Sequence, residues 1–138
     1  MGSLKTLALA TALAALTCGP SMADGFPISV GQRASAFALC TGAYTAVAEH
    51  SAMFDSEATE LAAKRRADFA QLLDAVHPHA LAYGLRKVDI TATRVQARAD
   101  MRTLLSAAKF SQEHERAAPA QAAIEARLAH CDRLLLGV

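Results

Sequence analysis

Apolar residues recur every three or four positions from Val30 to Leu136, in four successive segments. In the first segment this spacing links Val30, Phe37, Tyr44 and Val47. Such intervals place side chains on one face of a helix with 3.6 residues per turn, whereas a strand alternates at every second residue. The sequence therefore predicts an all-α chain of four helices.

Capping and breaking residues set the expected limits of these helices. Ser29 and Gln32 have the spacing of a capping box, and Asp55 can cap the second helix with its carboxylate. Pro78 lacks an N–H donor, so it should end the second helix and open the third, and Pro119 should open the fourth. The expected helices are 30–54, 56–77, 78–110 and 119–136.

Short connections favour antiparallel neighbours, so the expected architecture is an up-down-up-down four-helix bundle. In that arrangement the first helix lies between the second and the fourth. Gly84 falls inside the third helix and is expected to bend it. The bundle is expected to span residues 30–136 after a short N-terminal extension at 24–29, and a chain of 138 residues suits one such domain.

The charges are nearly balanced, with 14 Lys and Arg against 13 Asp and Glu. Binding to nucleic acid or to an anionic membrane needs an excess of clustered basic residues. The composition therefore argues against a nucleic-acid partner.

Met1–Ala23 has the features of a cleaved secretory signal peptide. Lys5 precedes the apolar run Leu7–Thr17, and small residues stand at the −3 and −1 positions before the expected cleavage after Ala23. The alternative is a lipoprotein acylated at Cys18, but the residues before that cysteine match such a signal poorly. We expect a periplasmic or secreted protein with no membrane anchor in its mature chain.

Cleavage would leave Cys40 and Cys131, and an even pair in an oxidising compartment predicts one disulfide. Cys40 should lie about 21 Å from the end of the first helix, and Cys131 about 18 Å from the start of the fourth. The two depths agree within a turn. A bond between the first and fourth helices would therefore close the bundle.

The first helix carries no charged residue from Ala34 to Ala48, although a surface helix normally has a polar side. Ala38, Gly42 and Ala46 recur at four-residue spacing, which would let another helix approach closely. One interpretation is that this helix lies at the centre of the bundle. The other is that these three residues form an interaction surface for a protein partner or for a second copy of the chain.

Candidate metal ligands lie near one end of the bundle. His50 and Met53 share a helix face, and His114 is expected in a turn at the same end. Histidine with a thioether would suit copper, but the three residues follow no fixed metal-binding spacing. No cofactor is expected, since covalent haem needs a Cys-x-x-Cys-His sequence that the chain lacks.

Arg94, Arg98 and Arg102 follow one another at four-residue spacing and form a basic ridge that could hold an acidic partner. The chain has no serine elbow and no glycine-rich phosphate loop, so no catalytic residues are predicted. The favoured hypothesis is a non-catalytic interaction protein. The alternative is a small periplasmic copper-type protein.

Overall fold

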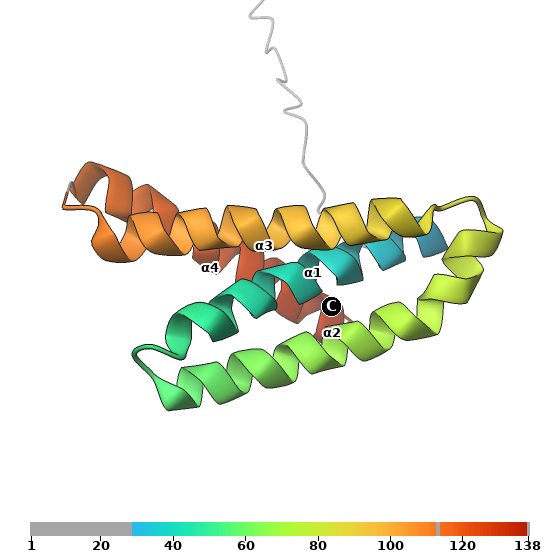
Figure 1. Ribbon diagram of the computed structural model, residues 1–138, viewed down its shortest axis with the longest axis horizontal. Coiled ribbons are helices and arrows are strands. Elements are labelled where there is room, and N and C mark those ends of the chain that lie inside the picture. The colour runs from blue at the N-terminus through green and yellow to red at the C-terminus, as the bar shows by residue number, and fades with distance from the viewer. Residues whose placement is uncertain (1–28, 113, 138) are drawn as a thin grey trace, which may run out of the picture.

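The computed structural model describes residues 29–112 and 114–137, which form four helices and no strand (Figure 1). They are α1 (Val30–Ser51), α2 (Ser56–Ala82), α3 (Lys87–Phe110) and α4 (His114–Leu136). The predicted all-α class with four helices is confirmed. The expected signal peptide and residues 24–28 of the extension lie outside the described residues.

The predicted starts of α1 and α2 are confirmed by their caps. The Gln32 N–H donates to Ser29 Oγ at 3.1 Å, and the Ser29 N–H donates to Gln32 Oε1 at 3.0 Å. Asp55 Oδ1 accepts from the Ala58 N–H at 3.0 Å. These side chains satisfy backbone donors that have no partner within the first turn of a helix.

The predicted boundary between the second and third helices at Pro78 is wrong, because Pro78 lies inside α2. Gly84 does not bend the third helix but ends the second, with a backbone φ of +92°. The Leu85 N–H donates to the Ala80 carbonyl and the Gly84 N–H to the Leu81 carbonyl, which is the Schellman pattern of a helix end. A glycine adopts this left-handed conformation without strain, so the turn forms there.

The fourth helix begins at His114, one turn and a half before the predicted start at Pro119. Glu115 lies in its first turn, where a carboxylate is favoured by the positive end of the helix dipole. Pro119 removes only one hydrogen bond close to the helix start.

α1 is the central helix, and it lies between α2 and α3 (Figure 1). The expectation that α2 and α4 would flank it is therefore wrong. α4 packs mainly against α3 and meets α1 at fewer positions. α3 takes the expected place of α4 because its backbone fits closely against the small residues of α1.

Ten of the 22 residues of α1 are buried, which agrees with its central place. Phe69 of α2 is fully buried against the rings of Phe37 and Tyr44, whose centroids lie 6.2 and 6.0 Å away. A second cluster joins α1, α3 and α4 through Ala43, Ala46, Met101 and Ile124.

α3 turns a different face to the core than its sequence suggests. The spacing favours Val88 and Val95 as core residues, but they are 61% and 60% exposed. The core face carries Ile90, Ala97 and Met101 instead. α3 thus keeps apolar side chains on its outer face as well.

Candidate functional site

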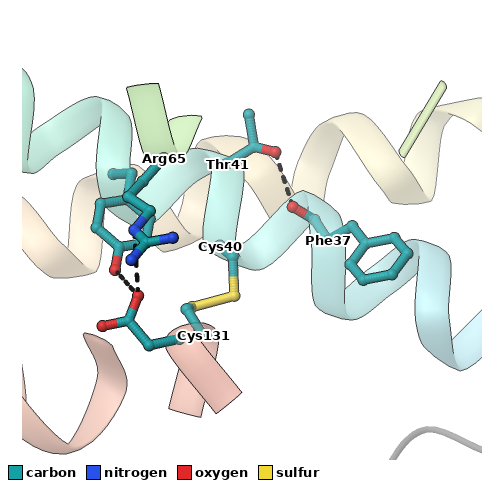
Figure 2. The surroundings of a disulfide bond; sticks show 7 residues. Phe37, Cys40, Thr41, Arg65 and Cys131 are labelled. Atoms are coloured by element: carbon teal, nitrogen blue, oxygen red, sulfur yellow. Dashed lines mark hydrogen bonds and ion pairs between the residues drawn. A yellow bond between two sulfur atoms is a disulfide. The ribbon is translucent and has the colours of Figure 1, made fainter. Parts of the chain in front are cut away.

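A disulfide joins Cys40 of α1 to Cys131 of α4, and both residues are fully buried (Figure 2). Their Cα atoms lie 5.7 Å apart, within the normal range for a bridged pair. The predicted pairing between the first and last helices is confirmed. α1 and α4 contact each other at few positions, and the disulfide links them covalently at one of these.

A polar network lies beside the disulfide and connects three helices. The Tyr44 hydroxyl on α1 donates to Asp132 Oδ1 on α4 at 2.7 Å, and Arg65 Nε on α2 lies 3.6 Å from the same oxygen. Burial, and then the hydrogen bond to Asp132, raise the pKa of Tyr44 above its ordinary value. The hydroxyl therefore stays a neutral donor, which suits a structural role.

The predicted interaction surface of Ala38, Gly42 and Ala46 is wrong, because α3 of the same chain covers it. All three residues are buried. A Cβ added at Gly42 would overlap the Arg94 carbonyl oxygen and lie 3.1 Å from the Ala97 Cβ. The small residues therefore serve the α1–α3 contact, and no outside partner reaches them.

Two of the three candidate metal ligands line one cavity at the end of the bundle where α1 and α3 finish. This cavity of about 290 Å³ is lined by Ala46, Glu49, His50, Met53, Arg102, Ser106 and Phe110. His50 and Met53 are thus brought together, as their spacing predicts. The side chain of His114 lies outside the described residues. In residues 29–112 and 115–137, no three His, Cys, Asp or Glu side chains cluster as metal ligands.

Three rings pack on one another beside this cavity, a feature that the sequence analysis did not find. The centroid of the His50 ring lies 5.4 Å from that of Phe54 and 6.2 Å from that of Phe110. Phe54 and Phe110 are 6.4 Å apart, and Lys109 Nζ lies 4.9 Å from the Phe54 centroid. We call Met53, Phe54 and Phe110 the aromatic patch; each is more than half exposed.

The predicted basic ridge lies on the exposed surface of α3. Arg98 donates to both carboxylate oxygens of Glu49 on α1, at 2.5 and 3.1 Å. Arg94 and Arg102 have no ion pair within the described part of the chain. The ridge runs toward the aromatic patch, since Arg102 also lines the cavity.

Another cavity lies at the opposite end, where α1 begins and α2 ends. It measures about 660 Å³ and is lined largely by Val30, Ala80, Tyr83, Gly84 and Leu85, with Arg33 as its one charged residue. None of the candidate residues from the sequence lies there.

None of the four helices, as far as they are described, combines the length and the apolar character that a bilayer crossing requires. Comparison with protein-family models, with curated proteins and with solved structures gave no match.

Proposed function

We propose that this chain is exported through a cleaved signal peptide and acts, in the periplasm or outside the cell, as a non-catalytic protein that binds another protein. It works as an up-down-up-down bundle held by the Cys40–Cys131 bond. The features of Met1–Ala23 support export, and a buried disulfide suits an oxidising compartment.

The observation that carries the binding proposal is the aromatic patch. Large side chains that pack on one another yet stay more than half exposed are unusual on a free surface. Aromatic residues, Met and Arg are also the residue types enriched at the centre of protein interfaces. We therefore propose the aromatic patch as the contact with a partner, in place of the surface of Ala38, Gly42 and Ala46.

A photoreactive benzoylphenylalanine placed at Phe110 tests this proposal in intact cells. It should give one discrete cross-linked product. Tyr83 is the matched control, since it is aromatic and 83% exposed but lies at the other end of the bundle. Absence of a product at Phe110, or equal products at both positions, would refute the proposal.

Intact mass of the protein recovered from the host tests export. The mature chain should start at Asp24. A chain that begins at Cys18 with acyl groups attached would instead make it a lipoprotein, and an uncleaved chain would contradict export.

A copper-type site is the second candidate function, because His50 and Met53 line the same cavity as Glu49. Imidazole and thioether ligands favour copper over harder ions. Stoichiometric copper in protein purified from the periplasm, lost in His50→Ala, would support this function. Copper content that does not change in that variant would rule out these ligands.

A further inference from the structure

The aromatic patch is held in place before any partner arrives. His50, Phe54 and Phe110 contact one another, and Lys109 lies against the Phe54 ring. These side chains come from the end of α1, the turn after it and the end of α3, which lie at the same end of the molecule (Figure 1). A surface that is already ordered loses little side-chain entropy on binding.

The charges of α3 are sorted to two sides of its exposed face. At about 100° per residue, the basic residues Lys87, Arg94, Arg98, Arg102 and Lys109 fall on one side. Asp89 and Asp100 fall on the other, and Asp89 is held by Arg86 through two hydrogen bonds. The side of α3 that leads to the aromatic patch is therefore positive.

Arg102 is the basic residue best placed to bind a partner beside the aromatic patch, because it belongs to the ridge and also lines the cavity. Glu49 already neutralises Arg98, whereas Arg94 and Arg102 have no ion pair within the described residues. Ser106 and His50 line the same cavity, and no hydrogen bond of theirs to a described residue is found. The cavity thus has a polar side, where Arg102, Ser106 and His50 lie with Glu49 as the one carboxylate, and an apolar side formed by Ala46, Met53 and Phe110.

The size of the cavity limits what can enter it. A volume of about 290 Å³ equals that of about ten water molecules and lies at the low end for small-molecule pockets. It suits one large side chain of a partner better than a whole ligand. The balanced charge of the chain argues against nucleic acid, which would need a larger positive area.

We propose that this end of the bundle binds an acidic protein segment that carries one large apolar side chain. The apolar side chain enters the cavity beside Met53 and Phe110, and the carboxylates of the segment pair with Arg102 and Arg94. The inference rests on the proposed function and adds to it the chemistry of the partner.

The test uses the full mature chain and a fluorescein-labelled peptide of four glutamates around one central phenylalanine. Fluorescence anisotropy should detect binding, and the dissociation constant should rise with salt, since exposed charge pairs are screened. Replacing the phenylalanine by alanine, or the glutamates by glutamines, should each weaken binding at least tenfold.

Two protein variants with the same change in net charge identify the site. Arg102→Glu should weaken binding of the peptide at least tenfold, whereas Arg66→Glu, at an exposed position on α2, should change it less than twofold. Both variants should melt within a few degrees of the wild type, as measured by circular dichroism. Equal weakening by the two variants would show attraction to overall charge and overturn the proposal.

The remaining outcomes separate this inference from the proposed function. Failure of the wild type to bind the peptide at 1 mM overturns the acidic-segment inference; a Phe110 cross-link in cells would then leave the binding function standing. A dimer detected by sedimentation and abolished by Phe110→Ser would show that a second copy is the occupant and that the inference is wrong. Lack of any cross-link at Phe110 removes the binding function itself.

Discussion

The two faces of α1 pack against their neighbours in different ways. Toward α3, the helix presents Ala38, Gly42 and Ala46, and the α3 backbone lies so close that Gly42 has no room for a Cβ. Toward α2 and α4, it presents Phe37, Tyr44 and Cys40, which are joined to Phe69, Asp132 and Cys131 by ring contacts, a hydrogen bond and a disulfide.

This difference determines what each face tolerates. The face of α1 that packs on α3 needs small side chains, so a larger side chain there should destabilise the fold. The face of α1 that contacts α2 and α4 relies on large side chains, a hydrogen bond and the disulfide. Removing any of these should lower the free energy of unfolding. Protein interiors are packed densely enough for both kinds of change to be felt.

The largest effect is expected for Gly42→Leu, which should prevent folding at 25 °C because the new side chain would overlap the α3 backbone. Gly31→Leu is the matched control in the same helix, where an added Cβ meets only the Ser29 hydroxyl oxygen at 3.9 Å. Its melting temperature should equal or exceed that of the wild type, since leucine favours helix over glycine. Circular dichroism melting compares them, and a Gly42→Leu protein that melts within 5 °C of the wild type would contradict the close fit.

Removal of the disulfide is expected to have the next largest effect. The bond closes a sequence separation of 91 residues, which corresponds to about 4.5 kcal/mol in the chain-entropy model. Cys40→Ala combined with Cys131→Ala should lower the melting temperature by well over 10 °C, since each kcal/mol shifts a domain of this size by about 4–8 °C. Reductant should bring the wild type down to the double variant and leave that variant unchanged; equal melting of oxidised and reduced wild type would contradict the prediction.

The Tyr44 hydroxyl should contribute less than the disulfide. Tyr44→Phe keeps the ring against Phe69 but removes the hydrogen bond to Asp132, which should cost about 1 kcal/mol of unfolding free energy at pH 8. Urea unfolding measures the difference. An unchanged free energy of unfolding in the variant would show that a water molecule donates to Asp132 as well as the tyrosine hydroxyl does.

The same pair of proteins should respond differently to high pH. Because the pKa of Tyr44 is raised in the folded state, its stabilising contribution is complete below pH 10 and is lost as the pH rises further. Above pH 10 the unfolded chain ionises this tyrosine while the folded chain must keep it protonated. The advantage of the wild type over Tyr44→Phe should therefore shrink between pH 8 and pH 11, and a constant difference would contradict the assignment.

The smallest effect is expected on the outer face of α3. Val95→Ser should change the unfolding free energy by less than about 0.5 kcal/mol, since Val95 is 60% exposed. Met101→Ser is the contrast on the core face and should cost several times more, because Met101 is fully buried. Similar losses of unfolding free energy in the two variants would show that Val95 is a core residue after all.

Local signals were sufficient for the number of helices, the caps at Ser29 and Asp55, and the disulfide. Each depends on residues a few positions apart or, for Cys40 and Cys131, on depth along a helix. The boundary at Gly84 was misplaced because Pro78 is the stronger breaker by type, whereas the left-handed φ at Gly84 ends the helix.

The arrangement of the helices could not be read from the sequence in the same way. α3 has apolar residues on two faces, and the fit against Gly42 selects the face with Ala97. Similarly, the spacing of His50 and Met53 predicted a shared face, but their proximity to Phe110 and Arg102 depends on how α3 lies against α1. Such contacts are set by tertiary packing.

The position of Cys131 on the last helix also fixes an order of events. Its thiol emerges only after α1, α2 and α3 have been synthesised, so oxidation cannot precede the synthesis of most of the chain. Until then Cys40 has no partner among the described cysteines, and in the complete fold both sulfur atoms are buried away from solvent reductants. The bond can therefore form only when nearly the whole helical region is present in one compartment, because it joins the first helix to the last.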